Sequence, residues 1–213
     1  MSSRGKTSAV RNLTSVYTVV IGVALSLAVA GVIDPQRGLL SVTQSSVLLF
    51  IAFVATLLPF VHGALMHLDV AYFDAAGGTR RGALVFDFIL LFFHALAFVV
   101  LSLLMNNAGH FAWAITGVLV IDVFWGVFAH FSGQDKNGPS APGRWATINA
   151  VFVLGAIAFL VANDIFLADP AHPTKIAVCV ACGAVIRTIV DYLWCREFYF
   201  PETRKRQKLT GKE

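Results

Sequence analysis

The chain is 213 residues long; 57% of its residues are hydrophobic, 13% are charged, and the mean hydropathy is +0.75. A soluble domain carries about 25% charged residues, so this composition excludes an ordinary soluble protein and indicates a helical membrane protein. The formal net charge of +4 lies mostly in the termini and turns, where it bears on membrane topology and gives no indication of nucleic-acid binding. Three cysteines cannot form a framework of disulfides.

Six stretches are long and apolar enough to cross a bilayer, which takes about 20 residues of helix. They are Tyr17–Ile33, Ser46–Met66, Gly82–Met105, Gly109–His130, Trp145–Leu167 and Thr174–Cys195. The expected fold is all-α: residues 1–213 form one domain, a bundle of six transmembrane helices, and residues 196–213 form its basic tail. The first stretch is expected to be a retained span because it shows no clear small-residue cleavage site. Because the links are short, consecutive helices are expected to be antiparallel and packed on each other.

Lysine and arginine residues in the loops predict the orientation of the spans. Arg37 and Lys175 fall on one side, and nearly all other basic residues of the loops and termini fall on the opposite side. We therefore expect both termini to be cytoplasmic, in a plasma (inner) membrane. The C-terminal tail carries a basic run that is expected to contact anionic lipid head groups: Arg204, Lys205, Arg206 and Lys208.

The sixth stretch contains two charges inside its hydrophobic run, Arg187 and Asp191. They are four residues apart, so on a helix they lie on one face and can pair. A charge within the membrane is costly, so the pair is expected to face the bundle interior or a water-filled cavity. Polar residues of other spans fall in the same, cytoplasmic half of the membrane. The expected polar cavity is lined by Asp87, Asp122, Arg187 and Asp191, with Asn149, His62, His94 and Trp125 near it.

Helical spacing places these groups on defined faces. The expected face of the fourth span consists of Val118, Asp122, Trp125 and Ala129. The expected face of the sixth span consists of Gly183, Arg187, Asp191 and Trp194. Gly126 and Gly183 lie beside the charges, where a small residue permits close approach of two helices.

The charges of this expected cavity do not balance. Asp87, Asp122 and Asp191 supply three carboxylates, whereas Arg187 is one cation. A low-dielectric site does not hold such a surplus, so a carboxyl or a histidine takes a proton, or a cation binds. The structural alternative is that Arg187 and Asp191 form a locking pair and the remaining aspartates are protonated or hydrogen-bonded links between helices.

Histidines support two weaker hypotheses. His62, His67 and Asp69 lie near the cytoplasmic end of the second span, and imidazole together with carboxylate is a plausible set of metal ligands. Histidine pairs from facing helices can hold haem, but no second histidine lies at the depth of His94. The sequence therefore predicts no cofactor, with haem as the weaker alternative.

Cys179 and Cys182 form a C-x-x-C near the outer end of the sixth span, and Cys195 lies at the opposite face. Membrane thiol oxidoreductases use such a pair, but they need another pair to relay electrons. Because alanine and glycine surround the pair, small-residue helix packing is its expected role. The chain contains no P-loop, zinc-protease motif or nucleophile elbow, which favours a protein that is not an enzyme.

The leading functional hypothesis is a small transporter or channel with a cytoplasm-facing acidic cavity. Its cargo is expected to be a proton, another cation or a small cationic solute, because the cavity has surplus negative charge. The alternative is a membrane-embedded structural or signalling subunit whose buried charges fix the packing of helices or of a partner. A redox or haem protein is the third hypothesis. The lipid bilayer is the expected partner, and a homo-oligomer is left open.

Overall fold

The computed structural model describes residues 3–33, 43–72, 81–131, 141–165 and 172–201. Within these ranges the regular elements are all helices. They are α1 (Ser3–Val32), α2 (Gln44–Tyr72), α3 (Arg81–Leu103), α4 (Ala108–Phe131), α5 (Ala141–Ala162), α6 (Pro173–Trp194) and the short α7 (Arg196–Tyr199). The first six are long and apolar enough to cross a membrane. The chain is therefore an all-α, multi-spanning integral membrane protein, as its composition predicts.

Three helix boundaries differ by five residues or more from those expected from hydrophobicity. Helix α1 begins at Ser3 and α2 continues to Tyr72, because polar residues prolong a helix beyond the apolar stretch that crosses the bilayer. Helix α5 ends at Ala162, five residues before the expected end at Leu167. The cause is local: Asp164 has a φ of 50°, a left-handed conformation that closes a helix.

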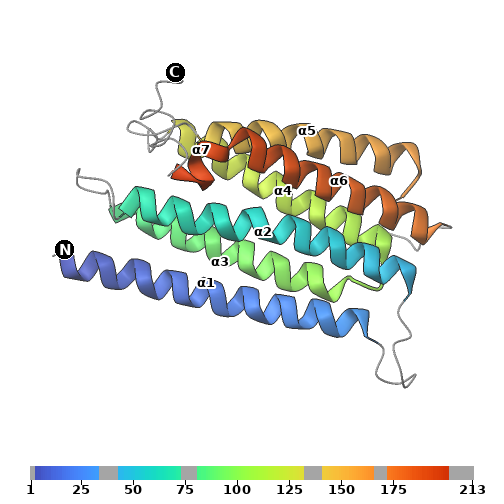
Figure 1. Ribbon diagram of the computed structural model, residues 1–213, viewed down its shortest axis with the longest axis horizontal. Helices are drawn as coiled ribbons and strands as arrows, with labels where there is room; N and C mark the ends of the chain where they lie inside the picture. Colours follow the sequence, from blue (N-terminus) through green and yellow to red (C-terminus); the bar gives the residue numbers. More distant parts are fainter. Residues whose placement is uncertain (1–2, 34–42, 73–80, 132–140, 166–171, 202–213) are drawn as a thin grey trace.

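The six long helices follow a closed ring in the order α1, α3, α4, α5, α6, α2, with α4 also contacting α6 across it. In Figure 1, α1 forms one edge of the bundle and α5 the opposite edge. The most extensive contacts join α4 to α5, α2 to α6 and α1 to α3. Consecutive helices do touch, but α2 packs far more on α6 than on α3, so the expectation that chain neighbours pair is only partly right.

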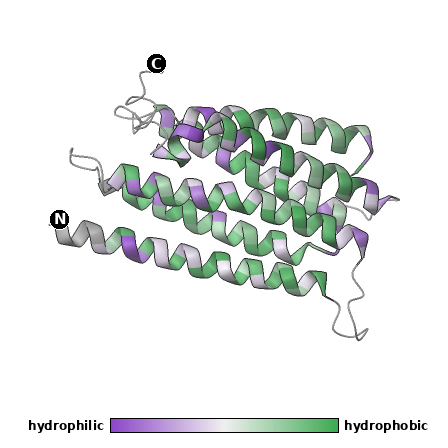
Figure 2. Cartoon of the chain, viewed as in Figure 1, coloured by the Kyte–Doolittle hydropathy of each residue, from purple (hydrophilic) through white to green (hydrophobic). Residues whose placement is uncertain are grey.

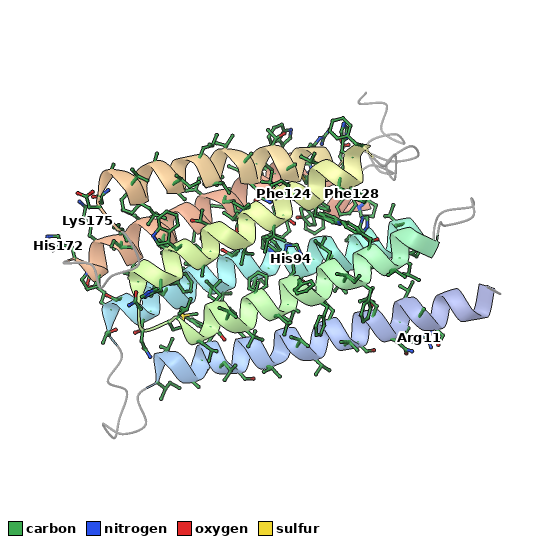
Figure 3. All side chains as sticks on the ribbon, turned by 180° about the vertical axis from the view of Figure 1, so that it is seen from behind. Arg11, His94, Phe124, Phe128, His172 and Lys175 are labelled. Carbon is green, nitrogen blue, oxygen red and sulfur yellow. The ribbon has the colours of Figure 1, made fainter. Side chains whose placement is uncertain are left out.

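The surface of the bundle is apolar. Figure 2 shows hydrophobic residues along most of the length of all six long helices, with polar residues gathered towards the ends. Large apolar side chains point outwards; Phe124 is 73% exposed, and Figure 3 labels it on α4 beside Phe128. Such a surface is stable against lipid tails, which supports contact between these helices and the bilayer.

The proline within α2 removes one backbone donor, and a neighbouring helix compensates for the loss. Pro59 has no N–H, so the carbonyl oxygen of Ala55, four residues earlier, lacks its helical partner. The hydroxyl of Thr188 on α6 donates to that oxygen at 2.5 Å. In a membrane such a carbonyl must be satisfied within the protein, so this bond fixes α6 against α2.

Glycine permits the closest helix contact near the site. A Cβ atom built on Gly126 would lie 2.7 Å from the carbonyl oxygen of Pro142 and 3.0 Å from the Cβ of Ala146. Gly126 therefore allows α4 and α5 to approach closely, as predicted. The same prediction for Gly183 is wrong, because a Cβ there would meet nothing within 4 Å.

Both described ends of the chain lie at the same end of the bundle (Figure 1). This arrangement agrees with an even number of spans. The basic run from Arg204 to Lys208 lies outside the described residues. The start of the expected tail is structured, however, because α7 directly follows α6 and buries Phe198 and Tyr199.

Candidate functional site

A chain of buried hydrogen bonds connects α4, α5 and α6. The amide nitrogen Nδ2 of Asn149 donates to Oδ2 of Asp122, and Nε of Arg187 donates to Oδ1 of Asn149 at 2.7 Å. Asn149 is fully buried and Arg187 is 3% exposed. Asn149 therefore bridges the carboxylate of Asp122 and the guanidinium of Arg187. The sequence predicted only that these three residues lie in the same half of the membrane.

Arg187 also pairs with the aspartate one turn further along α6. Its Nη2 lies 3.7 Å from Oδ2 of Asp191, the predicted i,i+4 ion pair. The face of the guanidinium stacks on Phe60 of α2, with Cζ 5.0 Å from the ring centroid. Such a contact stabilises a cation that is removed from water.

Helix α7 completes the site from the end of the bundle. The hydroxyl of Tyr199 donates to Oδ2 of Asp191 at 3.1 Å. Burial, and then the neighbouring carboxylate of Asp191, raise the pKa of Tyr199 well above that of an ordinary phenol, so it remains a donor. The turn that returns α7 to the bundle is held by Arg144 of α5, whose Nη1 donates to the carbonyl oxygen of Trp194 at 2.9 Å.

Four polar atoms around this network make no well-formed hydrogen bond among the described residues. They are Nη1 of Arg187, Oδ1 of Asp191, Nε2 of His94 and Nε1 of Trp145. All four side chains line one small cavity of about 30 Å³, which Asp122, Trp125 and Tyr17 also line. A cavity needs about 10–15 Å³ of such volume to hold a water molecule. The polar cavity therefore has room for one or two waters or a small ion.

Asp87 does not belong to this cavity. Its Oδ2 accepts a hydrogen bond from the hydroxyl of Tyr72 at 2.5 Å and lies 3.2 Å from Nε2 of His67. This separate polar cluster joins α2 to α3. Grouping Asp87 with Asp122 and Asp191 was therefore wrong: His94 of α3 lines the cavity, but Asp87, two turns away on the same helix, is bound by His67 and Tyr72 of α2 instead.

Trp125 lies between the two groups. Its indole packs edge-on against the ring of His67, with centroids 5.0 Å apart, and stacks on Trp145 at 5.7 Å. The predicted face of α4 is buried as expected, with Val118, Asp122, Trp125 and Ala129 all inside. On α6, Arg187 and Asp191 are buried but Trp194 is 48% exposed, so the inner face instead runs through Ala181 and Ala184.

The residues proposed as metal ligands are not brought together. Nδ1 of His62 lies 3.3 Å from the hydroxyl of Tyr192, His67 contacts Asp87, and Asp69 is exposed. Five residues on a helix amount to about 140° of rotation, so His62 and His67 point to different sides of α2. Across the described part of the chain, no three His, Cys, Asp or Glu side chains are grouped to hold a metal.

The prediction for the two cysteines of α6 is also corrected, whereas His94 lies where it was expected. Cys179 and Cys182 are free and exposed, so they do not contribute the expected helix packing. His94 lies between the helices (Figure 3), where its ring contacts Phe60 edge-on at 5.4 Å. It lines the polar cavity, as expected, although it makes no hydrogen bond through Nε2.

Sequence reasoning missed the aromatic residues that close the cavity. Tyr17 belongs to a stripe of buried α1 residues spaced three or four apart, which is a detectable signal. Trp145 and Tyr199 carry no such signal, since each lies at the end of a span where aromatic residues are common at the membrane interface. Tyr199 reaches the site because the chain turns into α7, where its ring contacts that of Trp145.

The fold and the site together define a six-helix integral membrane protein with a buried polar cavity. Compared with protein-family models, curated proteins and solved structures, the chain has no match.

Proposed function

We propose that the protein is a transporter or channel for protons or small cations and that the polar cavity is its binding site. The observation that supports this most directly is the group of four unpartnered polar atoms around a cavity of water size. Leaving such atoms unsatisfied destabilises a membrane protein, so their retention favours a site that binds something.

The charge balance supports a single positive cargo. With Asp87 in its own cluster, the cavity has two carboxylates, Asp122 and Asp191, and one guanidinium, Arg187. One proton or one monovalent cation neutralises the remaining charge. The volume of about 30 Å³ favours these over a larger organic cation. By the charge of the loops, the end of the bundle that holds the termini faces the cytoplasm.

A helix-locking subunit is the second candidate. The observation that favours it is the connected series Asp122–Asn149–Arg187–Asp191–Tyr199, which ties α4, α5, α6 and α7 together. A buried polar network that links several helices in this way fixes helix register even without a cargo.

The substitution Asp122→Asn distinguishes the two candidates. It keeps the size of the side chain but removes its charge and its ionisable proton. In a transporter, the variant should fold normally and lose cation or proton flux into vesicles, measured with a cation-sensitive or pH-sensitive dye. In a locking subunit, Asp122→Asn should change nothing, whereas Asp122→Leu should lower the melting temperature.

Asp87→Asn is the matched control, because Asp87 is a buried carboxylate of the same half that does not line the cavity. It should keep wild-type flux. Wild-type vesicles no more permeable than empty ones to protons and several cations would contradict the transport proposal. Unchanged flux in a folded Asp122→Asn protein would remove Asp122 from the site.

A further inference from the structure

A second, larger cavity lies beside the polar one. This α4–α6 groove has a volume of about 400 Å³ and is lined mainly by apolar residues of α4, α5 and α6. Its volume falls in the range of about 300–1,000 Å³ that small-molecule sites occupy. Arg187 is the charged residue in its lining, and it also lines the polar cavity.

Small residues create the groove. Gly155 of α5 and Gly183 of α6 both line it, and a Cβ atom added to either would meet nothing within 4 Å. Helix α5 packs far more extensively on α4 than on α6, which leaves this space between α5 and α6. Val151 in its lining is 62% exposed, so the groove opens at the apolar surface of the bundle, where a molecule can enter it from the membrane.

The groove has the shape of a site for an apolar chain. Its wall on α6 runs from Cys179 to Arg187, eight residues further along the helix, a rise of about 12 Å. Arg187 lies seven residues before the end of α6, so about 10 Å inside the membrane. A phospholipid keeps its charged head at the surface and cannot bring it to Arg187. A lipophile with a small, neutral polar end can place that end beside Arg187.

The charge around Arg187 selects the polar end of such a molecule. Arg187 already faces Asp191 directly and Asp122 through Asn149, so an added anion would meet two carboxylates. An uncharged acceptor oxygen meets no such repulsion. Nη1 of Arg187 has no acceptor among the described residues, and it carries two N–H groups that require one.

We propose that the α4–α6 groove binds a neutral lipophile whose acceptor oxygen receives a hydrogen bond from Arg187, the chemistry of a prenyl quinone. The apolar tail lies along Gly155 and Gly183, and the carbonyl oxygen meets the guanidinium at the Arg187 end of the groove. The proposal shares Nη1 of Arg187 with the polar cavity, but its test measures binding from the membrane and not flux, so either proposal can fail without the other.

Equilibrium binding of decylubiquinone to the protein in phosphatidylcholine nanodiscs tests this, with empty nanodiscs as the baseline for partitioning. Wild type should bind saturably. Gly183→Leu fills the groove and should weaken binding by about tenfold or more, equivalent to about 1.4 kcal/mol. Gly117→Leu makes the same change on the exposed side of α4, where a Cβ also meets nothing within 4 Å, and should bind like wild type.

Competing probes test the polar end. Hexadecane has the apolar chain without an acceptor, and palmitate has a charged head. Neither should displace decylubiquinone at equal concentration. If hexadecane competed as well as unlabelled decylubiquinone, the proposed hydrogen bond to Arg187 would be wrong. If palmitate bound more tightly than decylubiquinone, the proposed neutral head group would be wrong. Binding no greater than in empty nanodiscs would overturn the whole proposal.

The two cysteines of α6 locate the bound molecule without any substitution. Both are exposed, but Cys179 lines the groove and Cys182 does not. Decylubiquinone should therefore slow alkylation of Cys179 by N-ethylmaleimide and leave Cys182 unchanged, as read by mass spectrometry. Saturable binding with equal rates at both cysteines would place the lipophile elsewhere and contradict the proposal, even if Gly183→Leu failed to fold.

Discussion

Arg187 contacts other groups on three sides of its guanidinium. Nε binds Asn149, Nη2 faces Asp191, and the planar face lies over Phe60. A lysine could not reproduce this arrangement, since an ammonium has neither the fork of donors nor the flat face. At the residue scale, Arg187 is thus the group on which the polar cavity depends most.

Arg187→Ala should lower the free energy of unfolding by about 3–5 kcal/mol, because it leaves buried carboxylates without their cation. The measurement is a thermal melt in detergent. The double variant Arg187→Leu with Asp191→Leu removes both charges and should recover part of the loss. Lys175→Ala is the control, because Lys175 is exposed and contacts the exposed Asn163. An Arg187→Ala protein as stable as wild type would show that no buried pair is present.

Cys195 should be unreactive in the folded protein. It is 1% exposed, and burial, followed by the nearby Asp191, raises its pKa to about 12 from an ordinary 9.0. The thiolate is the nucleophile, so a rise of three units lowers the reactive fraction at pH 8 by about a thousandfold.

With Cys179→Ser and Cys182→Ser, Cys195 is the remaining cysteine of the three in the chain. Its rate of reaction with N-ethylmaleimide at pH 8 should be about a thousandfold lower folded than in denaturing detergent. In the folded protein the rate should rise about tenfold for each pH unit, because pH 8 is far below the raised pKa. Equal rates in the folded and denatured protein would mean that α7 does not cover Cys195.

At the scale of elements, the site depends on how closely α4 and α5 approach. Asp122 of α4 reaches Asn149 of α5, and Asn149 reaches Arg187 of α6, so a shift of α5 would separate all three. Gly126 lies one helical turn beyond Asp122, where α5 comes closest.

Gly126→Ala should therefore destabilise the protein by about 1–3 kcal/mol, because its Cβ would overlap the backbone of Pro142. Gly117→Ala is the matched control on the same helix. A Cβ at Gly117 meets nothing within 4 Å, so it should be neutral or slightly stabilising through its better helix propensity. Melting temperatures of the two variants in one detergent give the comparison, and equal values would contradict close α4–α5 packing.

At the scale of the whole molecule, both described ends lie at one end of a bundle of six spans (Figure 1). The polar cavity lies towards that end, since α7 closes it through Tyr199. Whether the cavity opens to the cytoplasm therefore depends on the side of the membrane that holds the termini.

We expect that side to be cytoplasmic because of the loop charges. Green fluorescent protein fused after Glu213 should fluoresce, and alkaline phosphatase fused there should be inactive. With the same two reporters inserted between residues 34 and 42, the phosphatase should be active and the fluorescent protein dark. An active phosphatase after Glu213 would reverse the orientation and place the cavity on the outer side.

The fold class required only the sequence. Long apolar stretches must form helices in lipid, because each backbone group needs a partner within its own segment. The pairing of Arg187 with Asp191 was equally local, since four residues on a helix fix their relation. The burial of Asp122, His94 and Asn149 also followed, because a polar group within a span avoids lipid.

Only the tertiary structure decided which of these buried groups meet. Hydrophobic spans resemble one another, so nothing in their composition places α2 beside α6 or separates α3 from it. Because of this helix arrangement, Asp87 contacts His67 and Tyr72, whereas Asp122 is linked through Asn149 to Arg187. The return of α7, the small cavity and the α4–α6 groove likewise result from side chains far apart in the chain, whose contacts depend on the shapes of neighbouring helices.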